Sequence, residues 1–201
     1  MLSFCATTPL MMKKSRISLL ALSALLLPLS LSAQNSETGE KGIQGQKAPL
    51  LNVSTWINLP EGKDKVEITD YKGKIIVLMF FQHWCRASQE RELPVLENLA
   101  KKYEGNPEIV FLAVQTVFQG FIDNTPDKLP ITAEKFHLKI PIGHALKTPD
   151  FPGVSGTYKP GGTPWWVIID REGIVEYNGF ILNEEEAIQN FDKMIAGLPL
   201  E

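Results

Sequence analysis

Residues 75–88 read IIVLMFFQHWCRAS. The first half, residues 75–81, is a continuous run of aliphatic and aromatic residues, which predicts a strand buried on both faces of a sheet. After Cys85 the period changes, because leucines recur at helical spacing and the polar residues 89–92 supply a solvated surface. We therefore predict that Cys85 lies where a buried strand passes into the N-terminus of a helix.

A cysteine in that position has unusual chemistry. Free backbone N–H groups and the positive end of the helix dipole stabilise a thiolate more than a neutral thiol. In such places the pKa of a thiol falls from its ordinary value of about 8.5 to between about 3.5 and 7.5. Arg86, the next residue, adds a positive charge that favours the thiolate further. A lone cysteine is more often buried and inert, but this position favours Cys85 as a reactive nucleophile.

Residues 1–33 have the composition of a secretory signal peptide. Three basic residues precede the uncharged apolar run 17–31, and small residues then offer a cleavage site. The apolar run is too short for a comfortable membrane span. We predict a cleaved leader, a flexible linker over residues 34–47, and one domain over residues 48–201.

Cysteine usage and charge fit a secreted protein. Cys5 leaves with the leader, so Cys85 is the only cysteine of the mature chain, in a compartment where most cysteines are paired. Without the basic residues of the leader the chain has 17 basic and 23 acidic residues, a net charge of −6, so we do not expect a nucleic acid as partner. We predict secretion across the inner membrane into the periplasm, with no stable membrane anchor after cleavage.

The remaining patterns predict a mixed α/β order. Residues 109–117 read as an apolar strand, which makes the helix after Cys85 a crossover between parallel strands. Pro94 is expected to kink that helix, and Asn183 and Gly197 are typical of the first and last positions of a C-terminal helix. The other predicted elements are strands at 51–57, 66–68 and 140–143, a helix from Thr132 to His137, a surface loop at 148–162, and a hairpin of strands 165–169 and 174–177.

Two motifs in this order resemble the thioredoxin superfamily. Residues 84–88, WCRAS, follow the first core strand, and residues 162–164, GTP, precede the hairpin. The leader, residues 80–84 and the helix segment 92–96, ELPVL, look like the secreted TlpA-type redoxins, and the resemblance covers the chain from about Pro49 onwards. It implies an α/β thioredoxin-like fold with a central mixed sheet flanked by helices.

The resemblance also implies roles for individual residues. In that family the proline that matches Pro164 is cis and lies beside the reactive thiol, and the backbone of the preceding residue, here Thr163, pairs with an extended substrate. Trp84 would shield the thiol. We therefore predict Cys85, Ser88 and Pro164 as catalytic residues, Trp84 and Thr163 as substrate-binding residues, and neither a metal nor a cofactor.

The chain departs from the usual Cys-x-x-Cys pair of this family, because Ser88 stands at the second position. Thiol exchange proceeds through a mixed disulfide, which a second thiol normally releases. A hydroxyl can hydrogen-bond a thiolate but cannot resolve that bond, so Cys85 needs an outside thiol. We predict a monothiol thiol-disulfide oxidoreductase, acting as reductase or isomerase, with a disulfide-containing protein or a low-molecular-weight thiol as partner.

Two other chemistries stay open. A one-cysteine peroxidase would attack peroxide with Cys85, although that family has Thr or Ser, and Pro, at the positions of Gln82 and Leu78. A copper-binding redoxin would combine Cys85 with His83 or His144.

A non-catalytic thioredoxin-like binding module is the last alternative. Its apolar contact surface would come from Phe118, Phe121, Trp165 and Trp166. We expect most of these aromatic side chains to belong to the core instead, with the segment around Phe118 and Phe121 folded back on the body of the domain.

Overall fold

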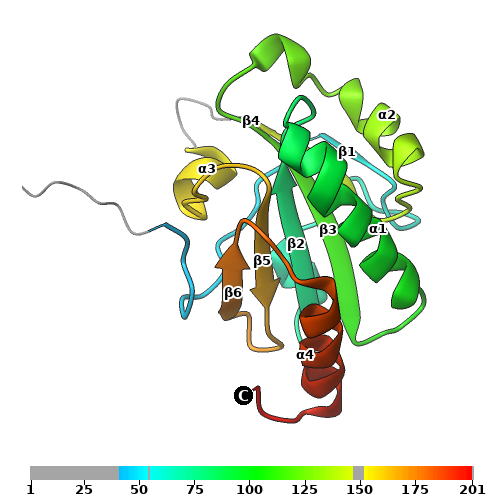
Figure 1. Ribbon diagram of the computed structural model, residues 1–201, viewed down its shortest axis with the longest axis vertical. Coiled ribbons are helices and arrows are strands. Elements are labelled where there is room, and N and C mark those ends of the chain that lie inside the picture. Colours follow the sequence, from blue (N-terminus) through cyan, green and yellow to red (C-terminus); the bar gives the residue numbers. More distant parts are fainter. Residues whose placement is uncertain (1–40, 54, 147–151, 201) are drawn as a thin grey trace, which may run out of the picture. The chain divides into compact units, whose positions relative to one another are not determined.

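The computed structural model describes residues 41–53, 55–146 and 152–200, which form one α/β unit (Figure 1). The predicted leader and the first part of the predicted linker lie outside these residues. None of the described helices has both the length and the apolar character that a membrane span needs.

A six-stranded mixed sheet forms the centre of this unit (Figure 1). The middle strand β2 (Ile75–Phe81) is parallel to β3 (Ile109–Val117) on one side and antiparallel to β5 (Trp165–Ile169) on the other. The strand order is β1-β4-β3-β2-β5-β6, with β1 at Thr55–Ile57, β4 at Ile142–Leu146 and β6 at Val175–Gly179. The predicted mixed sheet, its parallel central pair and its antiparallel hairpin are therefore confirmed.

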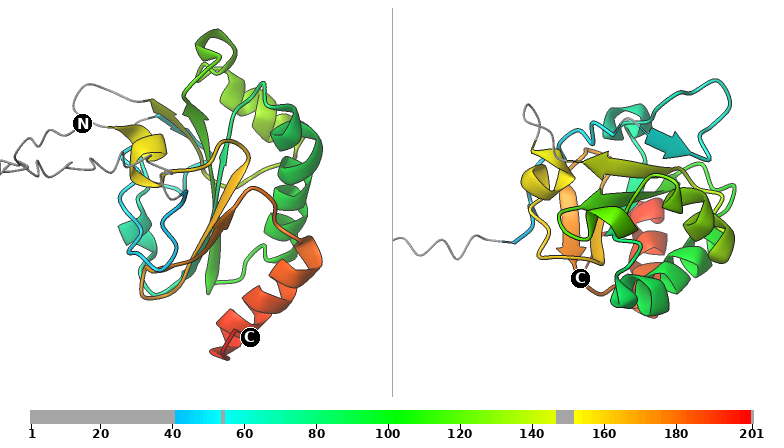
Figure 2. Two further views of the ribbon diagram at one scale, coloured as in Figure 1. Left: turned by 60° about the vertical axis from the view of Figure 1, so that its left-hand side comes forward. Right: turned by 90° about the horizontal axis from the view of Figure 1, so that it is seen from above.

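Helices cover both faces of the sheet (Figure 2). One face packs against α1 (Leu93–Lys102), α2 (Lys128–Lys135) and α4 (Glu184–Ala196). The other packs against α3 (Gly153–Thr157) and the short 3₁₀-helix η1 (Ile68–Tyr71). Because both faces are covered, every residue of β2 is buried, as its unbroken apolar run predicts.

The boundary predicted for α2 is wrong. The helix begins at Lys128 rather than at Thr132, whose side chain is buried in the middle of the helix. The sequence prediction treats Pro130 as part of the preceding connection. A proline is tolerated in the first turn of a helix, where its missing N–H would have no partner, so Pro130 lies inside α2 without breaking it.

Several short elements also differ from their prediction. Residues 66–68 form no strand, because η1 begins there. The strands predicted at 51–57 and 140–143 correspond to β1 and β4 with shifted boundaries. The surface loop predicted at 148–162 contains α3, whose Val154 is buried, and its first residues lie outside the described part. Short apolar runs signal burial, but they do not distinguish a strand from a packed loop.

The described part of the predicted linker is fixed against the edge of the sheet. Ile43 is buried, and its N–H donates to Asn178 Oδ1 at 2.8 Å. The N–H of Gly45 donates to the carbonyl of Val175 in β6 at 2.8 Å. Residues 41–47 are thus part of the domain rather than a free linker.

The C-terminal helix α4 has the predicted ends. The side chain of Asn183 accepts the N–H of Glu186 at 3.1 Å, and Gly197 ends the helix with φ of 70°, a left-handed conformation that glycine adopts readily.

Candidate active site

Cys85 lies between β2 and the first turn of the following helix, as predicted. Its N–H donates to the carbonyl of Gln82 at 3.0 Å, which closes a turn after the strand. Its own carbonyl accepts the N–H of Gln89 at 3.0 Å, in the first helical turn. The sulfur therefore lies at the end of the helix where backbone N–H groups are unpaired.

The helix after Cys85 begins at Arg86, passes through a π-helical segment, Ser88–Glu92, and continues as α1. The N–H of Leu93 donates to the carbonyl of Ser88, five residues back. Pro94 follows this segment in the first turn of α1, where a proline is tolerated. A π-turn holds more residues than an α-turn, so it changes which side chains face inward. Ser88 and Glu92 are both buried, and the prediction that Glu92 is a solvated surface residue is wrong.

The loop that contains Thr163 and Pro164 is distant in sequence from Cys85 but contacts it. The Thr163–Pro164 peptide bond is cis, as the family resemblance predicts, and it directly precedes β5. Because β5 pairs with β2, this loop lies at the same end of the sheet as Cys85. The Cys85 thiol donates to the carbonyl of Thr163 with an Sγ···O distance of 3.2 Å. The structure therefore brings the two predicted motifs together.

The pKa of Cys85 is lowered from its ordinary value. Burial, the largest single effect, raises the pKa, since the thiol is only 8% exposed. Four groups around the sulfur oppose burial, because they would donate hydrogen bonds to the thiolate, and together they outweigh it: the hydroxyl and N–H of Ser88, the side chain of Thr163 and the N–H of Ala87. Hydrogen bonds to the charged form of a group favour that form, so a larger fraction of the thiol is ionised near neutral pH.

The Ser88 hydroxyl is available to donate a hydrogen bond to the Cys85 thiolate. It is buried and has no hydrogen-bond partner among the described residues. A buried polar group without a partner costs free energy, and donation to a Cys85 thiolate would satisfy it. Arg86, in contrast, is exposed and forms an ion pair with Glu90 at 2.8 Å, and it is not among the groups that lower the pKa of Cys85.

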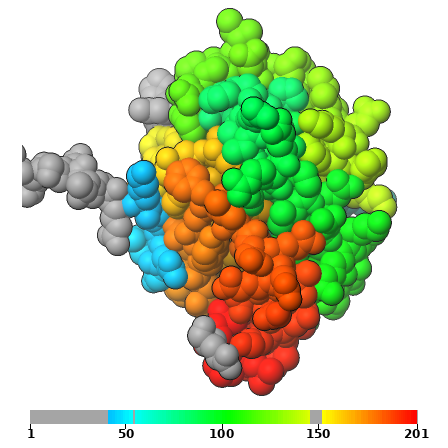
Figure 3. Space-filling view, viewed as in Figure 1, coloured from blue at the N-terminus to red at the C-terminus, as the bar shows by residue number. Residues whose placement is uncertain are grey.

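A group of exposed apolar side chains extends from the cysteine loop. Trp84 is 43% exposed, and its indole N–H donates to the carbonyl of Gln119 at 3.4 Å. The neighbouring loop carries Phe118, which is partly exposed, and Phe121 and Ile122, which are 63% and 88% exposed. We call Trp84, Phe118, Phe121 and Ile122 the apolar lobe. The 3₁₀-helix η3 (Phe121–Asp123) within it projects at the top of the space-filling view (Figure 3).

The aromatic residues predicted as one contact surface thus separate into two groups. Trp165 and Trp166 of β5 are buried, which confirms the expectation that they belong to the core. The expectation that Phe118 and Phe121 fold back on the body of the domain is wrong, because both side chains face solvent. Gly120 in this loop has φ of 63° and lies against the Trp84 indole, where a Cβ atom would clash, so the loop can approach the indole only with glycine there.

The two histidines considered for copper lie in separate hydrogen-bonded sites. His83 Nδ1 is 3.0 Å from the hydroxyl of Thr132, and His144 Nδ1 is 2.9 Å from the amide of Gln115. Burial is the largest cause that lowers the pKa of each imidazole. In the described part of the chain, no three His, Cys, Asp or Glu side chains are grouped so that they could hold a metal ion.

Two buried polar residues lie near the site, although the sequence pattern predicts no role for them there. Glu92 is buried, and its carboxylate accepts the indole N–H of Trp166 at 2.7 Å and the N–H of Leu182 at 3.2 Å, which ties the π-helical segment to β5. Gln82 is buried, and its side-chain amide donates to the hydroxyl of Thr163 at 3.2 Å. For Gln82 a signal existed, since it is a polar residue directly after a fully apolar strand.

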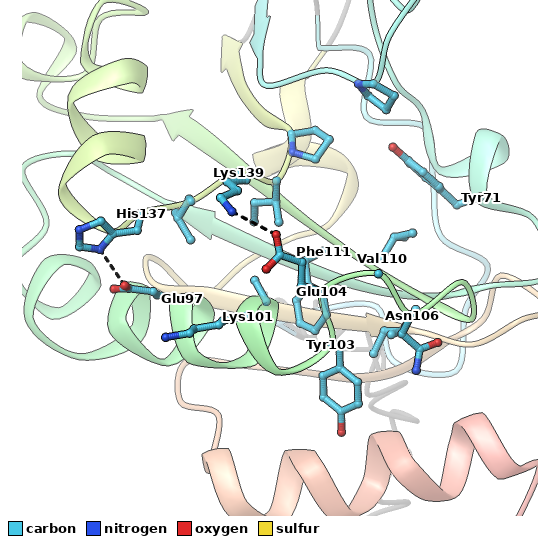
Figure 4. Close-up of a pocket in the computed structure, with 17 residues that line it drawn as sticks. Tyr71, Glu97, Lys101, Tyr103, Glu104, Asn106, Val110, Phe111, His137 and Lys139 are labelled. Atoms are coloured by element: carbon cyan, nitrogen blue, oxygen red, sulfur yellow. Dashed lines mark hydrogen bonds and ion pairs between the residues drawn. The ribbon is translucent and has the colours of Figure 1, made fainter.

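The most prominent pocket of the described residues lies elsewhere (Figure 4). It has a volume of about 730 Å³ and is formed by the end of α1, the start of β3 and the segment before β4. Two side-chain contacts cross its rim, a hydrogen bond between His137 Nδ1 and Glu97 at 2.8 Å and an ion pair between Lys139 and Glu104 at 3.2 Å. Cys85 does not line it.

Curated relatives share most of the chain, although no family model matches it. The chain is 32% identical over 137 residues to the thiol-disulfide oxidoreductase ResA of a Bacillus cereus strain, covering 68% of this chain and 69% of that protein. It is 28% identical over 138 residues to the thioredoxin-like protein YneN of Bacillus subtilis, covering 68% of this chain and 72% of that protein.

Solved structures confirm the predicted fold. The described domain resembles the crystal structure of a thioredoxin-like superfamily protein with a TM-score of 0.66 and 23% identity, covering 74% of this chain and 96% of that one. It resembles a thiol-disulfide isomerase from Corynebacterium glutamicum with a TM-score of 0.66 and 19% identity, covering 76% and 97% of the two chains.

Proposed function

The chain belongs to the thioredoxin-like thiol-disulfide oxidoreductases, and from this we propose that it exchanges disulfides through a single nucleophile, Cys85. The observation that supports this most is the geometry around one sulfur. Cys85 Sγ lies at a helix N-terminus, 3.2 Å from the carbonyl of Thr163 beside a cis proline, and the pKa of its thiol is lowered. The position at a helix N-terminus and the lowered pKa favour a reactive thiolate, and the contact with Thr163 puts the sulfur beside the proposed substrate-binding loop.

The proposed cycle has a mixed disulfide as its intermediate. The Cys85 thiolate attacks one sulfur of a substrate disulfide, forms a Cys85–substrate disulfide and expels the other substrate sulfur as a thiolate. An outside thiolate then attacks the Cys85 sulfur and releases the substrate thiolate. A second outside thiol removes the first as a disulfide and restores Cys85. One substrate disulfide is reduced and two outside thiols are oxidised, whereas attack by the substrate's own cysteine would give isomerisation.

The proposed need for an outside thiol follows from the cysteine content of the sequence. The sequence holds only one other cysteine, Cys5, in the predicted leader, and Cys85 is free in the structure. In the proposed Cys-x-x-Ser site the Ser88 hydroxyl donates to the thiolate but forms no disulfide. The Thr163 backbone and Pro164 would hold an extended substrate chain, and Trp84 would cover one side of the thiol. The leader at residues 1–33 would direct this TlpA-type protein across the inner membrane to the periplasm.

Oxidised glutathione provides the direct test. We expect the reduced protein to gain one glutathione on Cys85 and to release one equivalent of reduced glutathione, because a lowered thiol pKa raises the thiolate fraction that attacks. Excess reduced glutathione should then remove the adduct. Mass spectrometry of the intact protein follows both steps. An unmodified Cys85, or an adduct that persists in excess glutathione, would contradict a monothiol cycle.

The apolar lobe supports a polypeptide as the disulfide substrate. For Phe121→Ser we expect kcat/KM to fall about 10-fold with a disulfide in an unfolded protein, because contact with a substrate chain would bury part of the Phe121 side chain, and full burial of a phenylalanine contributes about 1.5–3 kcal/mol. The rate with oxidised glutathione, which is too small to reach the lobe, should change less than about twofold.

Leu198→Ser is the matched control for this measurement. Leu198 is also exposed but follows α4, at the opposite end of the sheet from η3 (Figure 1). It should leave both rates unchanged. Equal losses with the protein substrate and with glutathione in Phe121→Ser would show that the lobe acts on the thiol itself and not on the substrate.

A further inference from the structure

We propose that Gln82 is a positioning residue that acts on Cys85 through the side-chain hydroxyl of Thr163. Its amide would hold that hydroxyl so that the hydroxyl hydrogen points at the sulfur. The inference rests on the proposed function, in which Cys85 is the nucleophile, and adds a residue that no motif in the sequence marks.

Gln82 contacts both halves of the site. Its backbone carbonyl accepts the N–H of Cys85 at 3.0 Å, and its side-chain Nε2 donates to Thr163 Oγ1 at 3.2 Å. Phe80 and Trp165 form the final residue pair between β2 and β5 at this end of the sheet. Gln82 lies two residues after Phe80, and Thr163 lies two residues before Trp165. Side chains at such opposed positions meet across the end of a sheet.

The direction of the hydrogen bond decides its effect. When Gln82 Nε2 donates to Thr163 Oγ1, the hydroxyl oxygen acts as acceptor, and its hydrogen is left to donate to Cys85. The side chain of Thr163 is one of the hydrogen-bonding groups that lower the pKa of Cys85. If the amide were reversed, Gln82 Oε1 would attract the hydroxyl hydrogen and turn it away from the sulfur.

Gln82 is buried in a way that suits this role. It is 1% exposed, and its Oε1 has no hydrogen-bond partner among the described residues. A buried glutamine with an unpaired oxygen costs stability relative to an apolar side chain of the same shape. The bond to Thr163 is the one interaction described for its side chain, so we infer that the residue serves the site more than the core.

Charged groups nearby do not explain the state of the thiol. Arg86 is exposed in its ion pair with Glu90, the imidazole of His83 is bound to α2, and the carboxylate of Glu92 accepts from other groups. In the described part of the chain, the interactions that shift the pKa of Cys85 are burial and hydrogen bonds, with no charged side chain among them. Loss of one donor should therefore be measurable.

The test compares the pH dependence of Cys85 alkylation by iodoacetamide in single and double variants. Thr163→Val should raise the pKa of Cys85 by about one unit, since the thiolate would lose one hydrogen-bond donor. Gln82→Met, which keeps the side-chain length without a donor, should raise it by about half a unit. In the double variant the pKa should equal that of Thr163→Val alone, because Gln82 would have no hydroxyl left to orient.

Two further variants serve as controls. Gln82→Asn keeps the amide but is too short to reach Thr163, so it should raise the pKa as Gln82→Met does. Gln115→Met removes another buried glutamine amide, from β3, and should leave the pKa of Cys85 unchanged. Circular dichroism before each titration identifies any variant that fails to fold.

The outcomes separate the two proposals. Unchanged or lowered pKa values in both Gln82 variants, or shifts that add to that of Thr163→Val, would overturn the role of Gln82 and leave the function of Cys85 intact. A pKa at or above its ordinary value in the unaltered protein would count against the activated thiolate of the proposed function itself.

Discussion

Cys85→Ser is expected to reduce disulfide exchange to the uncatalysed rate, a loss of at least about 1,000-fold. The described chain has no other thiol, and a serine hydroxyl neither ionises near neutral pH nor forms a mixed disulfide. The measurement is turnover of a protein disulfide with added glutathione. Because the two side chains differ by one atom, the variant should fold like the unaltered protein, and lost activity would report chemistry.

Ser88→Ala is the matched control for this loss. It keeps the nucleophile and removes one donor to the sulfur, so its pKa for Cys85 should rise and its rate at neutral pH should fall by about 10-fold or less. Activity in Cys85→Ser within about 10-fold of the unaltered protein would mean that the exchange does not use this sulfur, and the proposed site would be wrong.

Elements with local signals were predictable from sequence. The apolar run of β2 is an unbroken pattern, and both ends of α4 are defined by residues within one turn, Asn183 and Gly197. The start of α2 was missed because Pro130 is a helix breaker in most positions and acceptable in the first turn. Residues 66–68 read as a strand because Val66 and Ile68 are apolar, but tertiary packing buries these two side chains without strand pairing.

The polar surroundings of the sulfur depend on contacts between distant residues. Thr163 is 78 residues from Cys85 and 81 from Gln82, so only pairing of β2 with β5 brings the three together. The family resemblance predicts roles at the site for Thr163 and Pro164, but it predicts none for Gln82. Glu92 was assigned to the surface because an α-helical period was assumed, and the π-helical segment changes that period.

The exposure of the apolar lobe has a related cause. Phe121 and Ile122 are apolar, and the composition of their loop favours a position against the core. The loop contacts the half-exposed Trp84 instead, through the hydrogen bond from the indole to the carbonyl of Gln119, so the loop is anchored without being buried. We propose that this loop remains exposed because it contacts the substrate of the proposed nucleophile.

Ser88→Cys is expected to shorten the lifetime of the mixed disulfide on Cys85 by about 100-fold or more in the absence of outside thiol. The hydroxyl and N–H of Ser88 are close enough to the Cys85 sulfur to lower the pKa of its thiol, so a thiol at position 88 would lie within reach of it. An intramolecular thiol attacks with an effective concentration far above that of a dilute reagent. The products would be an internal disulfide between Cys85 and the introduced thiol, and the released substrate thiol.

Residue 88 is fully buried, so the substrate should still be attacked by the more accessible Cys85. The measurement is mass spectrometry of acid-quenched samples after the reduced protein meets a substrate disulfide. The unaltered protein and Ser88→Ala should accumulate the mixed disulfide, whereas Ser88→Cys should convert it to the internal disulfide. Equal accumulation in all three would show that the π-helical segment holds position 88 out of line for exchange. Rapid release from the unaltered protein without outside thiol would instead refute the monothiol cycle, because Ser88 has no sulfur with which to resolve the bond.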